Sequence, residues 1–418
     1  MFLFSPEQRF TCSECGRCCH RTTVPVTAHE ADAYRKAGVE RWFRERGEDA
    51  EGSASDAFEP IPGHASLLRI RKRRDGACGF LTPEGRCRIH EVLGGDRKPL
   101  SCRLFPFSFH PIGPGANDAV VKTSFSCPTV IANAGATIGS QKLELQALHV
   151  AWTRELPEVG ATVELARGYP APRAALPLLR TTLCRILDRP GAGGAPDLRA
   201  NLRRIAVWLE DLSRRRVLAL PPDDLVEYIT LTGGYAIGNE KALQARAPAR
   251  LARLLFRGFL LAALSVQLNL DPALARRRIA LRVLLFRLLA HIHGLGPGAA
   301  GFDYGRAIAV PLRLDDPVVH AIAARYLRAG FETLGTGRRA VFDEIALIAA
   351  HLNAACAFGG MNAAANGKSA VDAESFTQGL LESSDLSHAD DGGRLSGFLT
   401  TLSGGLEALY LFPPNHST

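Results

Sequence analysis

The sequence predicts an α+β protein that is mostly α-helical, with a small cysteine-rich module of short strands and turns followed by a large all-helical domain. Eight of the ten cysteines lie before residue 128, and apolar residues follow helical spacing beyond residue 135. The chain has 418 residues, more than one average domain, and its 46% hydrophobic and 22% charged residues are typical of globular proteins. We therefore expect two domains, residues 1–135 and residues 136–418.

The first element is a dense group of thiols in residues 10–20, FTCSECGRCCH. This stretch holds four cysteines: Cys12, Cys15, Cys18 and Cys19. Two residues between successive cysteines let a tight turn point several sulfurs into one concavity, as zinc ribbons and iron–sulfur loops do. Gly16 supplies the backbone freedom that such a turn needs. The stretch therefore predicts a metal-binding turn.

The next elements are a short strand, a helix and a loop. Residues 22–27 are typical of a strand, and Thr27 with Glu30 three positions later forms the pattern of a capping box. This pattern predicts a charged helix through about residue 47. Residues 48–63, rich in Glu, Asp, Ser, Gly and Pro, predict a loop.

Four further cysteines follow in turn-rich surroundings: Cys78, Cys87, Cys102 and Cys127. Residues 67–71 predict a strand, and residues 79–89 predict a hairpin with Gly85 in its turn. Because the ends of a hairpin lie close together, the two cysteines that flank it can converge on one site. Residues 98–107 form a proline-bounded turn around Cys102, and Cys127 precedes a proline, as the last cysteine of the bacterial ferredoxin motif does.

The second domain is predicted from helical spacing and capping residues. A leucine-rich helix follows Asp197, a second runs from Asp271-Pro272 to Gly294, and a third runs from Asp316-Pro317 to near Gly330. A fourth, residues 342–358, is expected to stop at Gly359-Gly360. Residues 294–301 and 362–369 predict loops. Two cysteines in apolar helical surroundings, Cys184 and Cys356, are expected to be core residues.

The eight N-terminal cysteines are enough for two sites of four sulfurs, but the sequence does not divide them between sites. Adjacent Cys18 and Cys19 diverge in side-chain direction, so they either serve different sites or one of them is structural or bridging. Zinc accepts four thiolates, and a 4Fe-4S cluster accepts one thiolate per iron. The C-x2-C-x2-C triplet with a remote Cys-Pro favours an iron–sulfur cluster, with zinc as the alternative. Disulfides and unrelated buried thiols are the other, less favoured interpretations.

Charged residues and histidines near the cysteines have two interpretations. The net charge is +8, and the basic run at residues 69–74 is interpreted as a solvated strand or loop rather than a nucleic-acid patch. Three histidines are interpreted as surface or supporting residues rather than metal ligands: His20, His90 and His110. Four basic residues lie near Cys87 and Cys102 and either offset thiolate charge or are ordinary surface cations: Arg88, Arg97, Lys98 and Arg103.

Several classes of protein are disfavoured. The first residues lack the basic and apolar regions of a signal peptide, and charged residues interrupt every long apolar stretch, so we expect a soluble, cytoplasmic protein that does not contact a membrane. No GxGxxG motif follows a strand, and the P-loop, HExxH and radical S-adenosylmethionine C-x3-C-x2-C motifs are absent. Phosphate-loop and zinc-protease functions therefore have no support.

The cysteine segments resemble a bacterial family of cysteine-cluster proteins, the YkgJ-like CxxCxxCC proteins, described as a zinc- or iron-chelating domain. The resemblance covers residues 10–20, residues 78–91 and residues 98–107. This sequence departs from the family pattern at His90, where the family more often has Tyr, and at Lys98, where the family more often has Arg. The resemblance implies that the metal ligands are drawn from seven cysteines: Cys12, Cys15, Cys18, Cys19, Cys78, Cys87 and Cys102. The Cys-Pro pattern adds Cys127 to them.

A more distant similarity is to the flagellin lysine N-methylases, which combine a related cysteine cluster with a long helical part. This similarity implies a 4Fe-4S cluster and S-adenosylmethionine in a protein lysine N-methyltransferase. The motif CSECGRCC resembles the general family more closely. We therefore expect first a metal-binding protein whose helical domain binds a protein partner or substrate, and second the methyltransferase. S-adenosylmethionine binding would separate them.

Overall fold

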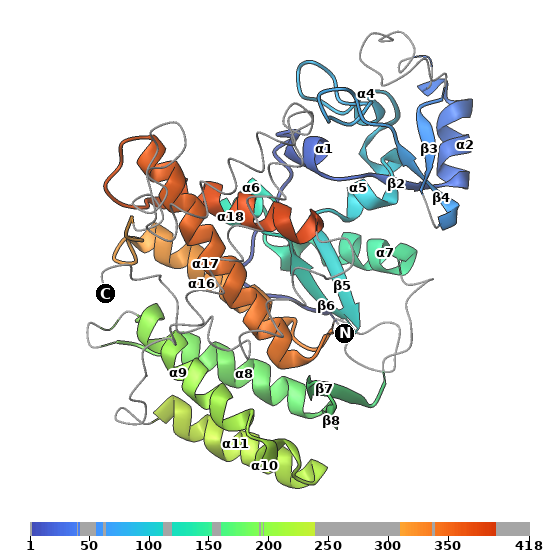
Figure 1. Cartoon of the computed structure of the whole chain (residues 1–418). Coiled ribbons are helices and arrows are strands. Elements are labelled where there is room, and N and C mark those ends of the chain that lie inside the picture. Colours follow the sequence, from blue (N-terminus) through green and yellow to red (C-terminus); the bar gives the residue numbers. More distant parts are fainter. Residues whose placement is uncertain are drawn as a thin grey trace, which may run out of the picture. The chain divides into compact units, whose positions relative to one another are not determined.

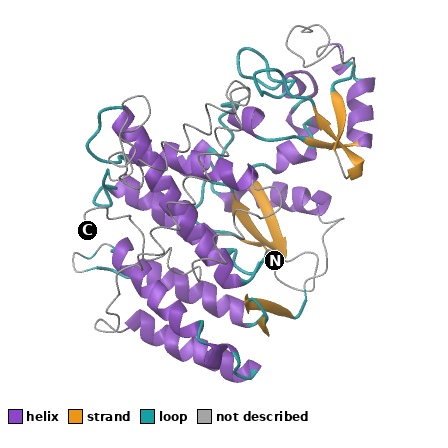
Figure 2. Cartoon of the chain, in the orientation of Figure 1, coloured by secondary structure: helices purple, strands orange, loops and turns teal. Residues whose placement is uncertain are grey.

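The structure is a computed structural model, and it describes residues 2–39, 41, 56–61, 64–111, 119–152, 160–191, 194, 196–238, 310–336 and 339–389. Helices dominate these residues and the strands are short (Figure 2), which confirms the predicted α+β, mostly α class. The chain divides into two compact units, one of residues 1–109 and 115–157 and the other of residues 110–114 and 158–418. We call them the cysteine-rich unit and the helical unit. The predicted boundary at residue 135 stays a prediction.

The cysteine-rich unit contains two small sheets. In the first, β2 (Pro25–Thr27) and β3 (Phe58–Ile61) both pair antiparallel with the central β4 (His64–Ile70). In the second, the strand order is β1 (Phe2–Leu3), β6 (Ala119–Thr123) and β5 (Phe107–Pro111), with β1 parallel to β6. The strand predicted at residues 67–71 is thus the end of β4, and the strand predicted at residues 22–27 is shorter, because only its last three residues pair.

The helices that the structure describes in the cysteine-rich unit are short. They are α1 (Arg17–Arg21), α2 (Ala28–Lys36), α4 (Arg88–Leu93), α5 (Leu100–Leu104), α6 (Pro128–Ala132) and α7 (Lys142–Trp152), with 3-10 turns at Gly95–Arg97 and Ile138–Gln141. Figure 1 shows α2 alongside the sheet of β2, β4 and β3. Most of the predicted cysteine sites lie in or beside these short helices.

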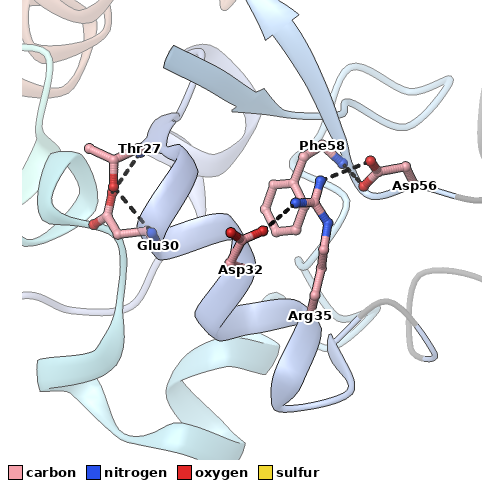
Figure 3. Close-up of polar contacts among 6 residues, drawn as sticks. All are labelled: Thr27, Glu30, Asp32, Arg35, Asp56 and Phe58. Carbon is pink, nitrogen blue, oxygen red and sulfur yellow. Dashed lines mark hydrogen bonds and ion pairs between the residues drawn. The ribbon is translucent and has the colours of Figure 1, made fainter. Parts of the chain in front are cut away.

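The capping box predicted at the start of α2 is confirmed. The Thr27 hydroxyl accepts from the Glu30 amide at 3.1 Å, and the Glu30 carboxylate accepts from the Thr27 amide at 2.9 Å (Figure 3). The helix ends at Lys36 and not near residue 47, because Gly38 takes a left-handed conformation with φ of 74° just beyond it. Residues 40, 42–55, 62 and 63 lie outside the described residues. In the described part of the predicted loop at residues 48–63, the prediction is wrong at Phe58–Ile61, because these residues pair with β4 and form β3.

Arg35 ties α2 to the neighbouring sheet. Its guanidinium lies 2.8 Å from the Asp32 carboxylate and 2.9 Å from that of Asp56, and it sits over the Phe58 ring (Figure 3). Phe58 is buried in the core of this unit. Arg35 therefore fixes the C-terminal part of α2 against Asp56 and Phe58.

The helical unit consists of seven described helices and one β-hairpin. They are β7 (Thr162–Ala166), β8 (Tyr169–Pro172), α8 (Ala175–Leu187), α9 (Leu198–Leu212), α10 (Arg215–Leu218), α11 (Pro222–Gly238), α16 (Pro317–Glu332), α17 (Val341–Ala365) and α18 (Ala373–Ala389). Two predicted caps are confirmed: Asp197 accepts from the Ala200 amide before α9, and Asp316 accepts from the Val318 amide before α16. The hairpin adds to the helices that the spacing predicts, and the helix predicted from Asp271 to Gly294 and the loop after it lie outside the described residues.

The predicted stop of the long apolar helix at Gly359-Gly360 is wrong. Helix α17 continues to Ala365 and packs beside α18 (Figure 1). The loop predicted at residues 362–369 is therefore wrong through Ala365 and begins only after the helix ends. A Cβ atom on Gly379 of α18 would collide with the Ala355 carbonyl oxygen and would lie 2.6 Å from the Gly359 amide nitrogen. The two backbones approach closely here, so glycine serves packing inside the helices rather than terminating one.

Among the described residues, α17 is also long and apolar enough to span a membrane by length and composition. Its most apolar window is 72% buried inside the protein, which is the burial of a core helix. Cys356 on α17 is buried, which confirms that it is a core residue. Cys184 on α8 is only partly buried, so its predicted place in the core is not confirmed.

Candidate metal centre

One cavity of about 230 Å³ in the cysteine-rich unit is lined by all eight N-terminal cysteines. These are Cys12, Cys15, Cys18, Cys19, Cys78, Cys87, Cys102 and Cys127. All ten cysteines of the chain are free thiols. Segments up to 115 positions apart in sequence therefore bring to one place a donor set that soft metal ions prefer.

The thiols are gathered around the cavity rather than closed on a point. Among the described residues, no three Cys, His, Asp or Glu side chains lie close enough together to hold a metal ion as they stand. Cys12 and Cys15 are exposed, whereas Cys78 and Cys127 are buried. The donor chemistry fits a thiolate-bound metal, and ligation requires the thiols to move toward each other.

The segment that carries the first two cysteines is held by residues near the end of the unit. The Phe10 amide donates to the Ala136 carbonyl at 2.9 Å, and the Arg9 amide donates to the Asn133 side chain at 2.7 Å. The Ser13 and Thr129 hydroxyls are 3.0 Å apart. These contacts place the start of the cysteine motif beside the helix that begins after Cys127.

Gly16 turns the chain into α1, as predicted. Its φ of 71° lies in the left-handed region, and a Cβ there would be 3.3 Å from the Gly85 carbonyl oxygen. The Cys78 amide donates to the Cys19 carbonyl at 2.7 Å. The glycine turn and this hydrogen bond bring the cysteines of α1 against the segment that carries Cys78.

The predicted hairpin is present in a shortened form. Leu81 pairs with Cys87, the Thr82 amide donates to the Arg86 carbonyl at 2.7 Å, and Gly85 has a φ of 79°. The prediction that the second strand of the hairpin continues to residue 89 is wrong, because α4 begins at Arg88. The hairpin and the start of α4 together bring Cys87 to the same cavity as Cys78.

Cys102 lies on α5, and Glu30 of the capping box accepts a hydrogen bond from the first residue of this helix. The other carboxylate oxygen of Glu30 accepts from the Leu100 amide at 2.9 Å, and Ser101 donates to the Pro25 carbonyl at 2.9 Å. The Tyr34 hydroxyl donates to the Arg97 carbonyl at 2.8 Å. The segment around Cys102 is thus fixed to α2 and β2.

The electrostatic state of the thiols differs from one to the next. A hydrogen bond between their side chains lowers the pKa of Cys18 to about 6 and raises the pKa of Cys19. Burial raises the pKa of Cys78 to about 11 and that of Cys102 to about 12. Since metal ions bind thiolates, metal binding at the buried cysteines has to release protons.

Lys72 is a functional candidate that the sequence interpretation missed. Its ammonium donates to the Cys19 carbonyl at 3.1 Å; burial lowers its pKa, and the charges of Cys78 and Cys19 oppose this shift. The run at residues 69–74 was expected to be solvated, and Arg69 and Arg71 do pair with Glu59. The signal was the two-residue alternation of a strand: Lys72 has the parity of buried Ile70.

The other basic residues and histidines divide between the two predicted interpretations. Lys98 lines the cavity, and its charge acts on the Cys18 and Cys102 thiols, whereas Arg88 pairs with Glu91 at 3.4 Å on the surface. His90 lines the cavity with its Nδ1 atom 3.4 Å from the Glu14 carboxylate. The cavity lining thus contains one of the three histidines noted in the sequence.

Comparison with known families supports metal binding by this part of the chain. Residues 11–128 match the CxxCxxCC family model, described as "Putative zinc- or iron-chelating domain". The predicted resemblance to this family is confirmed over these residues. No match was found among curated proteins or among solved structures.

Proposed function

We propose that the cysteine-rich unit holds an iron–sulfur cluster of the 4Fe-4S type on its N-terminal cysteines. The observation that carries the proposal is the convergence of eight thiols on one cavity of about 230 Å³. The match to a zinc- or iron-chelating domain supports the choice of metal ions as the occupant. Binding of a protein partner or substrate by the helical unit and a cytoplasmic location stay predictions.

The size of the cavity favours a cluster over a single zinc ion. A single water molecule needs about 10–15 Å³ of cavity volume, so a cavity of about 230 Å³ is far larger than one small ligand requires. A zinc ion touches its four sulfurs directly at about 2.3 Å and leaves little space between them. A polynuclear group of iron and sulfide fills more of the volume before the thiols have to close.

Charge and polarity around the cavity also support a thiolate-bound cluster. Thiolate ligands bring negative charge, and the ammonium groups of Lys72 and Lys98 lie where they offset it. Phe80 and Ile89 line the cavity and belong to the buried core of the unit. Apolar walls limit the access of solvent to a cluster, which affects its reduction potential.

The test is the metal and sulfide content of the full-length protein purified without oxygen, together with its absorption spectrum. We expect iron and acid-labile sulfide in about equal amounts and absorbance near ~400 nm from charge transfer between thiolate and iron. A matched Cys184→Ser variant, changed in the helical unit, should keep the same content. Zinc without sulfide and without this absorbance would overturn the iron–sulfur proposal and leave zinc binding.

A further inference from the structure

We propose that the eight thiols form two adjacent metal centres rather than one. The inner centre uses Cys19, Cys78, Cys87 and Cys102, and the outer centre uses Cys12, Cys15, Cys18 and Cys127. This proposal rests on the proposed function, metal binding by these cysteines, and adds the division that the spacing of the cysteines leaves open. The division applies to iron–sulfur clusters and to zinc ions alike, because each takes four thiolates.

The inner set is defined by shared packing. Cys78 belongs to a hydrophobic cluster of buried residues in the unit, together with Phe80 and Ile89. Three partly buried cysteines pack against the same cluster: Cys19, Cys87 and Cys102. The charges of Cys78 and Cys87 act on both the Cys19 and the Cys102 thiols, and the charge of Cys18, which lies at the border of this set, also acts on Cys78 and Cys102. Cys78 and the three cysteines that pack against the cluster form one set on the apolar side of the cavity.

The outer set lies on another side of the same cavity. Cys12 and Cys15 are exposed and do not belong to the hydrophobic cluster. Cys127 immediately precedes α6, and the thiol whose charge acts on it is that of Cys15. The hydrogen bond between Ser13 and Thr129 fixes this pairing of the cysteine motif with α6.

Cys18 completes the outer set. Cys18 and Cys19 follow each other on α1, and successive residues of an α-helix point about 100° apart. Their side chains contact each other, so the two thiols lie at the border between the sets. Cys19 packs against the hydrophobic cluster, which already supplies three further thiols, and Cys18 continues the spacing of Cys12 and Cys15.

The assignment leaves each centre with a full set of ligands. Four thiolates satisfy a tetrahedral zinc ion or the four irons of a 4Fe-4S cluster. A five-and-three division would leave one centre with a surplus thiol and the other with a vacant position. The border position of Cys18 and Cys19 then places the two centres next to each other, joined by one peptide bond.

The experiment measures bound metal per chain in full-length variants by elemental analysis and native mass spectrometry. Cys12→Ser, at an exposed position, is expected to lose about half of the metal, and Cys12→Ser with Cys127→Ser should lose the same half and no more. Cys12→Ser with Cys87→Ser should lose nearly all of it. Cys184→Ser is the control and should retain the wild-type content.

The outcomes separate this proposal from the proposed function. Complete loss of metal in Cys12→Ser, while wild type is loaded, would indicate one shared centre and overturn the division. Unchanged metal in Cys12→Ser, or a further loss on adding Cys127→Ser, would overturn the outer set. Wild-type protein without bound metal would instead defeat the proposed function itself. Because Cys87→Ser affects a residue packed on the core, the exposed Cys12 and its partner Cys127 decide the result.

Discussion

The cysteine-rich unit and the helical unit obtain their order from different sources. The longest described helix of the cysteine-rich unit, α7, has 11 residues, whereas α17 in the helical unit has 25. Helices shorter than about 12–15 residues are marginal on their own in water, so packing or ligation has to stabilise them. The long apolar faces of its helices therefore stabilise the helical unit, whereas the short helices of the cysteine-rich unit depend on contacts between side chains from distant segments.

The cores of the two units show the same contrast. In the helical unit, fully buried Leu179, Leu327 and Phe331 lie on helices that pack along their length. In the cysteine-rich unit, the hydrophobic cluster includes the buried thiol of Cys78, and further thiols pack against it. If those thiols bind metal, removing the metal should weaken one unit and leave the other unchanged.

The largest expected effect is the loss of metal ligation. Cys15→Ser and Cys102→Ser should each lose metal and make the cysteine-rich unit sensitive to protease, because ligation contributes on the order of 10 kcal/mol at a structural site. Serine keeps the size of cysteine but is a poor ligand for soft metal ions, so the change tests ligation. Limited proteolysis of the full chain, with fragments identified by mass spectrometry, measures the effect.

In these variants the described helices of the helical unit should stay protected, and the helical signal in circular dichroism should persist. Full metal content and an intact cysteine-rich unit in both variants would show that Cys15 and Cys102 are not essential ligands. Equal loss of protection in both units would break the contrast between them.

A core substitution in the helical unit should have the opposite pattern. Leu179→Ala removes a fully buried side chain from α8 and should lower the free energy of unfolding of this unit by about 2–5 kcal/mol. Metal content should not change. Thermal unfolding and elemental analysis of the same samples test both points. Leu231→Ala on α11, where the side chain is 65% exposed, is the control and should cost less than about 0.5 kcal/mol.

Glu30→Ala should have an intermediate effect, confined to the cysteine-rich unit. The substitution removes the capping contact with Thr27 and the acceptor of the Leu100 amide, so we expect a loss of about 1–2 kcal/mol. Faster release of metal to a chelator should accompany it, since Leu100 begins the helix that carries Cys102. Asp32→Ala, which removes an exposed ion pair with Arg35, should cost about 0.5 kcal/mol or less. Equal release rates for both variants would contradict this role of Glu30.

The smallest expected effect is the acid dependence of one carboxylate in each unit. A hydrogen bond from Arg73 holds the pKa of Asp75 near 2, and one from Lys368 does the same for Asp372. Each carboxylate therefore stabilises the fold above about pH 4, and this contribution is lost as the pH falls through about 2. Because both groups are largely exposed, each contributes less than about 1 kcal/mol.

Asp75→Asn and Asp372→Asn should each lower stability slightly at neutral pH and match the wild type near pH 2. Thermal unfolding between pH 2 and pH 7 measures this convergence. If the variants are still less stable than the wild type near pH 2, loss of the ion pairs is not the cause of the difference in stability. Protonation of metal-bound thiolates would add a further acid sensitivity to the cysteine-rich unit, and loss of metal would accompany it.

Local signals in the sequence were sufficient for much of the fold. The capping box at Thr27 and the caps at Asp197 and Asp316 were predicted, because each depends on residues within three positions. The predicted end of the helix at Gly359 was wrong, because glycine at this position allows the close approach of α18 and does not end the helix. The length of α2 was also wrong, because Gly38 ends it within a charged stretch.

The sequence indicated which cysteines line the cavity but not how they are arranged, and their role as metal ligands stays a prediction. The spacing from Cys12 to Cys18 indicated a turn, and the Cys-Pro at Cys127 indicated a remote partner. The division of the thiols depends on which of them pack against the hydrophobic cluster, a tertiary feature that spacing does not contain. Lys72 was missed because its run of basic neighbours hid the alternation of the strand.

The most direct test of metal ligation by cysteine is X-ray absorption at the iron and zinc edges of the full-length protein purified without oxygen. We predict iron with a first shell of sulfur only and with further iron atoms in the second shell. This first shell should lose sulfur in Cys15→Ser, while Cys184→Ser gives the wild-type spectrum. A first shell of nitrogen and oxygen at either edge, or a spectrum that Cys15→Ser does not alter, would contradict this prediction.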